Sequence, residues 1–124
     1  MIQETPLGKF GQFITEKLRD NSIQFAEDVL EGKYKSHRLI ALQQRLSTLD
    51  ENQKRIALDF AKTIIRTGIH DFLFALVERS DIQGDINILV DGKDIIQASD
   101  GIHGEAYGED GWYAKYSKYG EVDD

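Results

Sequence analysis

The segment richest in chemically active side chains is residues 99–105, Ser-Asp-Gly-Ile-His-Gly-Glu. Two carboxylates, Asp100 and Glu105, flank the imidazole of His103, and such a set can transfer protons or bind a metal ion. The segment has neither the ligand ladder of an EF-hand nor a glycine-rich turn that holds phosphates. A small metal-dependent or acid/base enzyme is therefore one hypothesis, beside a solvated turn and part of a protein-binding surface.

The other histidines, His37 and His70, are far apart and do not form a zinc-ligand spacing such as two histidines four positions apart. His70 precedes Asp71, but neighbouring helical side chains point about 100° apart, so we expect no direct hydrogen bond between them. The chain has no cysteine, which excludes disulfides, thiolate ligands and a cysteine nucleophile. We predict no catalytic residue, no metal site and no cofactor.

Aromatic residues alternate with acids near the end of the chain, where Tyr107, Trp112 and Tyr113 surround Glu109 and Asp110. We expect Trp112 in the core and the two tyrosines at the surface, where tyrosine gives a large contact area at low entropic cost. Aromatic rings beside carboxylates are suited to a desolvated contact with Arg or Lys. The predicted partner-binding residues are Asp100, His103, Glu105, Tyr107, Glu109, Asp110 and Tyr113.

The formal net charge of −7 is distributed unevenly along the chain. Residues 1–77 hold ten acids and eleven bases, whereas residues 78–124 hold twelve acids and four bases. The acidic half repels phosphate backbones and anionic lipids, which argues against nucleic-acid and membrane partners. A basic protein partner is the natural complement.

The first two thirds of the chain has helical periodicity and helix-boundary signals. Thr5 is a typical N-cap, Pro6 a typical first helical residue and Gly32 a typical residue after a helix end. Thr48 followed by Glu51 matches a capping box. The predicted helices cover residues 5–31, 36–47 and 50–78, within a single domain of residues 1–124.

Apolar residues Ile56, Phe60 and Ile64 step by four through the third predicted helix. We therefore expect this helix to be the central element against which the others pack. Gly68 costs about 1 kcal/mol relative to Ala inside a helix, so it predicts a close packing contact.

After Arg79 the pattern changes to short apolar runs between glycines. Residues 86–90 and 94–98 flank Asp91-Gly92-Lys93, a strong local signal for a β-hairpin. Alternation over Trp112 to Tyr116 predicts a third strand. The predicted fold class is α+β, with three N-terminal helices packed on a small C-terminal antiparallel sheet of three or four strands.

No apolar run approaches the roughly 18–20 residues needed to span a bilayer. The first ten residues also lack the basic-then-apolar layout of a signal peptide. We therefore expect a cytoplasmic protein.

Four segments of the second half carry a resemblance to known proteins. They are Asp71-Phe-Leu-Phe-Ala-Leu76, Ile88-Leu-Val-Asp-Gly92, residues 99–105, and Gly111-Trp112 with Tyr116-Ser-Lys-Tyr-Gly-Glu121. Their arrangement resembles small acidic bacterial immunity proteins of contact-dependent growth inhibition and other polymorphic toxin systems. The resemblance covers mainly residues 71–121. It implies a cytoplasmic protein without catalysis that binds a cognate toxin domain and covers its active site. We expect that toxin to be a nuclease, because an acidic surface is complementary to a basic substrate groove. A structural subunit that pairs through its helices is a further alternative.

Overall fold

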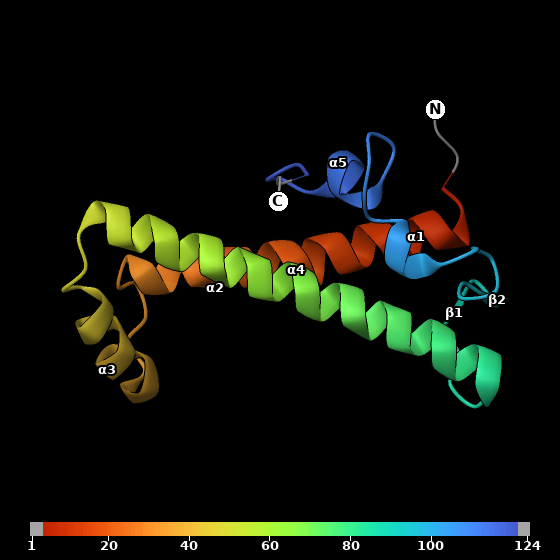
Figure 1. Ribbon diagram of the computed structural model, residues 1–124, viewed down its shortest axis with the longest axis horizontal. Coiled ribbons are helices and arrows are strands. Elements are labelled where there is room, and N and C mark those ends of the chain that lie inside the picture. The colour runs from red at the N-terminus through yellow and green to blue at the C-terminus, as the bar shows by residue number, and fades with distance from the viewer. Residues whose placement is uncertain (1–3, 122–124) are drawn as a thin grey trace.

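The computed structural model describes residues 4–121, so residues 1–3 and 122–124, the two ends of the expected domain, lie outside the described residues. Helix α4 runs along the molecule, with helix α3 at one end and the hairpin β1–β2 at the other (Figure 1). The elements in chain order are α1 (Pro6–Ile14), η1 (Thr15–Asp20), α2 (Asn21–Leu30), α3 (His37–Leu46), α4 (Glu51–Ile82), β1 (Leu89–Val90), β2 (Lys93–Asp94), η2 (Ile102–Gly104) and α5 (Trp112–Tyr116).

The first helical segment begins and ends at its expected signals. The Thr5 hydroxyl accepts a hydrogen bond from Gly8 N at 2.9 Å, and Pro6 occupies the first turn. Gly32, with φ of +72°, follows the last residues of α2. Between α1 and α2 the backbone makes one turn of π-helix, η1, so helical structure continues from Pro6 to Leu30.

Helix α4 begins with a different cap from the one that the sequence suggested. Its N-cap is Asp50, whose carboxylate accepts from Gln53 N at 2.8 Å while the Gln53 side chain accepts from Asp50 N at 2.9 Å. The Thr48 hydroxyl instead donates to the carbonyl of Arg45 at 2.8 Å, so the predicted Thr48–Glu51 box is wrong. The helix also continues four residues beyond the expected end at residue 78.

The predicted α+β fold with a sheet of three or four strands is wrong. The sheet in the described residues has two antiparallel strands of two residues each, with Leu89 opposite Asp94. The turn Asp91-Gly92 forms as expected, and both residues have positive φ, 51° and 78°. The last backbone bond between the two chain segments runs from Ile95 N to Ile88 O at 2.9 Å. Beyond it the Asp94 carboxylate accepts from Ile96 N at 3.0 Å and the chain turns into the core.

The segment Trp112 to Tyr116, predicted to form a third strand, is instead the helix α5. Trp112 and Tyr113 are neighbours in the sequence, yet they are only 4% and 2% exposed. A strand would send them to opposite faces, whereas a helical turn allows both to face one core. Their N–H groups donate to the carbonyls of Glu105 and Ala106 at 3.0 and 3.1 Å, which fixes the start of the turn.

The hydrophobic core lies between α1, the second half of α4 and the segment that follows β2. Trp112 packs on α1 at Gly11, where a Cβ atom would lie 2.3 Å from the indole Nε1. A residue with a side chain therefore cannot replace Gly11 without moving the tryptophan. The buried residues of this core are Ile14, Ile69, Leu73, Leu76, Ile95, Ile96, Ile102, Ala106, Trp112 and Tyr113.

A buried ion pair ties the C-terminal segment to η1. Arg19 and Asp20 are 4% and 5% exposed, and Arg19 Nη1 lies 3.3 Å from Asp20 Oδ1. The Ser117 hydroxyl accepts from Arg19 at 2.6 Å and donates to Asp20 at 2.6 Å, and Lys118 N donates to Asp20 at 2.8 Å. In the wider π turn, Thr15, Arg19 and Asp20 share the inward face.

Candidate functional site

The segment around the predicted site is held on the C-terminal core. Ile102 and Ala106 are 0% and 2% exposed and anchor its two halves. The Ser99 hydroxyl donates to the Glu105 carboxylate at 3.0 Å and accepts from Gly101 N at 3.0 Å. Helix η2 begins at the first anchor, Ile102, and packs on α4. Residues 99–111, here called the acidic loop, therefore have a defined conformation with two buried anchors.

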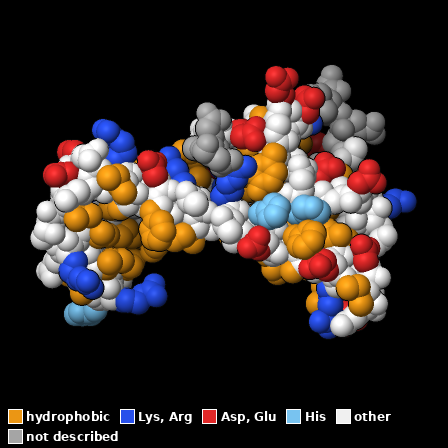
Figure 2. All heavy atoms as spheres, viewed as in Figure 1, with side chains coloured by type: hydrophobic (Ala, Val, Ile, Leu, Met, Phe, Trp, Pro, Cys, Tyr) orange, Lys and Arg blue, Asp and Glu red, His pale blue; other side chains and the backbone are white. Residues whose placement is uncertain are grey.

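Three of the predicted contact residues, Asp100, Glu109 and Asp110, are exposed on the acidic loop. None of the three has an ion-pair partner among residues 4–121. Figure 2 shows acidic side chains gathered at the end of the molecule that carries α5 and the hairpin, and few over α3. The charge asymmetry of the sequence is thus also visible on this face of the molecule.

His103 is half-buried and packs against α4. Its ring centroid lies 4.9 Å from that of Phe74 and 5.5 Å from that of His70, edge to face in both pairs. Gly101 lies next to the ring, since a Cβ atom at this position would be 2.8 Å from it. The prediction that His70 and Asp71 make no direct hydrogen bond is wrong, because His70 Nδ1 lies 3.2 Å from Asp71 Oδ1 at the surface.

The structure does not bring the three residues of the enzyme hypothesis into one group. Asp100 is exposed, Glu105 bonds to Ser99, and His103 packs on Phe74. Across residues 4–121, no three His, Cys, Asp or Glu side chains form a group that could hold a metal ion.

The two tyrosines of the predicted surface differ in exposure. Tyr107 is half-buried, with the guanidinium of Arg66 4.4 Å above its ring centroid. Tyr113 is 2% exposed, beneath the guanidinium of Arg19 at 4.2 Å, so its expected exposure is wrong. The rings of Tyr107 and Tyr113 meet edge to face at 5.7 Å. Tyr107 therefore reaches the surface above a buried aromatic support.

The Tyr113 hydroxyl is buried without a hydrogen-bond partner among the described residues. Tyr113→Phe is expected to keep the free energy of unfolding at pH 7 or raise it by up to about 1 kcal/mol, because an unsatisfied polar group leaves the core. Urea denaturation would measure the change. A loss above about 1 kcal/mol would show instead that the hydroxyl makes a stabilising bond.

The same substitution has a pH-dependent effect. Burial raises the pKa of Tyr113 to about 12, so the folded state favours the protonated phenol. The protonated phenol therefore contributes to the free energy of unfolding below the unfolded-state pKa of about 10, and this contribution is lost as the pH rises through about 12. Tyr113→Phe should therefore reduce the alkaline loss of stability. Some loss remains because burial and a bond to Glu27 also raise the pKa of Tyr119.

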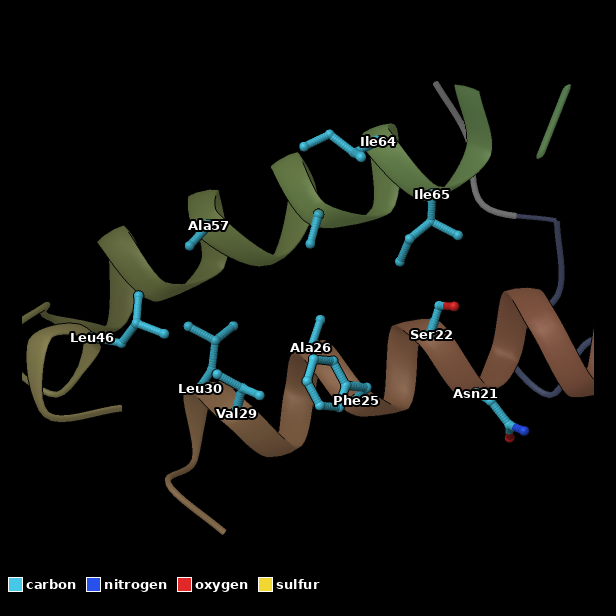
Figure 3. A pocket seen from close by; sticks show the side chains of 11 residues that line it. Asn21, Ser22, Phe25, Ala26, Val29, Leu30, Leu46, Ala57, Ile64 and Ile65 are labelled. Atoms are coloured by element: carbon cyan, nitrogen blue, oxygen red, sulfur yellow. The ribbon is translucent and has the colours of Figure 1, made fainter. Parts of the chain in front are cut away.

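An apolar groove is a feature that the sequence did not reveal. Ile56, Phe60 and Ile64, expected to pack other helices, are 60%, 66% and 54% exposed. Beside Ile64, α2, α4 and the end of α3 enclose a groove of ≈ 520 Å³ (Figure 3). The i, i+4 spacing in α4 was a signal for an apolar face, but spacing does not tell whether another element covers that face.

None of the helices in residues 4–121 combines the length and apolar character needed to cross a bilayer. The chain matches no model of a known protein family, no curated protein and no solved structure.

Proposed function

We propose that this chain is an immunity-type binding protein that neutralises a cognate toxin, of the nuclease class, in the cytoplasm. One observation carries the proposal. Asp100, Glu109 and Asp110 are exposed and unpaired within the described residues, on a loop anchored by the buried Ile102 and Ala106. A nuclease binds a polyanion, so its active-site groove is basic, and an acidic surface on a preorganised loop is complementary to it.

The acids and the tyrosine of this surface have different roles. Charge complementarity accelerates encounter and orients the partners, because the attraction acts before contact. Affinity comes mainly from desolvated anchors, for which tyrosine is well suited. The half-buried Tyr107 is the anchor at this surface, whereas the buried Tyr113 holds it from below. The proposed contacts are Asp100, His103, Glu105, Tyr107, Glu109 and Asp110.

The resemblance of residues 71–121 to small acidic immunity proteins is a second support for the proposal. An immunity protein needs no chemistry of its own, since covering the toxin's active site is sufficient. The described contacts of Asp100, His103 and Glu105 are structural or solvent-facing and suit this role.

Affinity capture on the tagged chain tests the proposal. The native cell lysate is applied at low salt, bound proteins are eluted with rising salt, and each is identified by mass spectrometry. Recovery of a basic nuclease whose activity falls when the purified chain is added supports the proposal. A captured nuclease that keeps full activity in the complex, or no basic partner at all, contradicts it.

Charge reversal of the acidic loop gives a quantitative expectation for that complex. The double variant Glu109→Lys/Asp110→Lys should slow association roughly tenfold at low salt and weaken its salt dependence, because steering is lost. Stopped-flow mixing over a salt series measures both. The control Glu78→Lys/Asp81→Lys has the same net charge change at exposed positions of α4. Equal rates for the two variants would exclude the acidic loop from the interface.

A further inference from the structure

The apolar groove extends along much of α4. Its larger part lies between α2 and α4, with Leu46 at one end, and the side chains of Leu30 and Ala26 point toward α4 (Figure 3). A second hollow of ≈ 280 Å³ continues it and shares Ser22, Ile64 and Ile65 with the first. The combined surface reaches from Ala57 to Phe72, about 22 Å along a helix axis, the length of roughly four helical turns.

The lining of this groove is suited to an apolar helix face. Apart from Asn21 and Ser22 its side chains are apolar, and none of the charged residues in the described part of the chain lines either hollow. Phe25 and Phe72 are 42% and 58% exposed. Burial of such side chains by a partner is favourable in proportion to the apolar area that it removes from water. A long depression between two helices also has the shape that accommodates a third helix.

Cations of α3 and of the segment before it, at one end of the groove, are unpaired within the described residues and select the chemistry of that helix. Residues 31–55, which include α3, carry six bases and three acids, and the acids Glu31 and Glu51 pair with Lys33 and Lys54. A hollow that shares Leu30 with the groove is lined by charges of both signs, Glu27, Glu31, Glu51, Lys54 and Arg55. Lys35, Arg38 and Arg45 have no ion-pair partner among the described residues, and Arg45 adjoins the lining residue Leu46. Figure 2 shows Lys and Arg side chains around the apolar surface at the α3 end. These cations would pair with carboxylates on the flank of a bound helix.

We infer that the groove is a docking site for an amphipathic helix of a partner protein, with its apolar face in the groove and acidic residues toward α3. The helix spans about four turns and packs between α2 and α4. The acidic loop is not part of this surface, so the inference stands apart from the toxin-binding function proposed above.

A pair of labelled model peptides tests the charge preference. Both are sixteen-residue designed helices with leucines at i, i+3, i+4 and i+7 spacing, and the flanking positions are Glu in one and Lys in the other. Fluorescence anisotropy at low salt should show the Glu peptide binding at least about tenfold more tightly, since Lys35, Arg38 and Arg45 attract it. Arg38→Glu/Arg45→Glu should remove that preference. No binding of the Glu peptide, or tighter binding of the Lys peptide, overturns the inference.

A matched pair of substitutions tests the location. Ile64→Glu places a charge in the groove at a side chain 54% exposed, and Ile82→Glu places one at the far end of α4, where exposure is 79%. The first should weaken Glu-peptide binding about tenfold or more and the second should leave it unchanged, with circular dichroism unaltered in both. Equal binding by the two variants overturns the location. Sedimentation equilibrium that detects a dimer abolished by Ile64→Glu would instead assign the groove to a second copy of the chain.

Discussion

Asp20→Asn is expected to lower the free energy of unfolding by about 3–5 kcal/mol, because it leaves the buried guanidinium of Arg19 without its counter-charge. The two side chains are 5% and 7% exposed, so water cannot replace the lost carboxylate. Asp20 also accepts from the Ser117 hydroxyl and from Lys118 N, and an amide can satisfy only part of this set. The loss should detach the C-terminal segment from η1 first.

The measurement is urea denaturation followed by circular dichroism, with Asp85→Asn as the matched control. Asp85 also pairs with an arginine, Arg79, at 2.7 Å, but both side chains are about half exposed to water. Surface pairs of this kind contribute little, so the control should lose much less stability. Comparable losses of unfolding free energy in the two variants would mean that the buried Arg19–Asp20 pair stabilises the protein no more than an exposed pair does.

Gly11→Ala is expected to destabilise the protein by about 1–3 kcal/mol through overpacking. The new methyl would lie 2.3 Å from the indole of Trp112, so the ring or the helix must move. Trp112 is the single tryptophan of the chain, so its emission reports the displacement directly. A red-shifted emission maximum, together with a lower midpoint in urea, is the expected result.

Gly68→Ala is the control, with the same substitution inside another helix. Apart from its chain neighbours and the nearby backbone of α4, no described atom lies within 4 Å of a Cβ built there, so the sequence-based expectation of a close packing contact at Gly68 is wrong. Alanine should stabilise this position by about 0.5–1 kcal/mol, because it restricts the unfolded chain and favours the helix. A destabilised Gly68→Ala, or a Gly11→Ala as stable as the native chain, would contradict the packing described for α1.

The helical part could be predicted because its signals are local. The Thr5 cap, Pro6 and Gly32 each act within a few residues, and all three have the expected place in the structure. The end of α4 was harder to place. The helix continues to Ile82 because buried Leu76 and Ser80 still face the core, and it stops only before Gly84 adopts φ of +68°.

The C-terminal half could not be predicted because its conformation depends on distant contacts. Ile95 and Ile96 have strand-like composition, but they are drawn into the core next to α4. Trp112 can fold into a helical turn against α1 only because Gly11 lies opposite, about a hundred positions earlier in the chain. Short apolar runs do not distinguish strand from helix without such information.

The candidate site was predicted in part for the same reason. Charge alone placed Asp100, Glu109 and Asp110 at the surface, where the structure has them. Exposure of Tyr113 could not be judged, because the cation that covers it, Arg19, belongs to a helix far earlier in the chain. The apolar groove exists because no other described element covers this face of α4. A local sequence pattern does not show whether a helix face is covered.

The position of the core along α4 gives the molecule two levels of local stability. The cluster around Trp112 contains Ile14 and residues from Ile69 onward, whereas α3 packs on α2 without joining it. Fluctuations that separate α3 from its neighbours therefore cost less free energy than global unfolding and leave the C-terminal core intact. The larger part of the groove, with Leu46 of α3 in its lining, lies at this weaker end. A helix bound there would stabilise the closed arrangement of α3 and suppress its local opening.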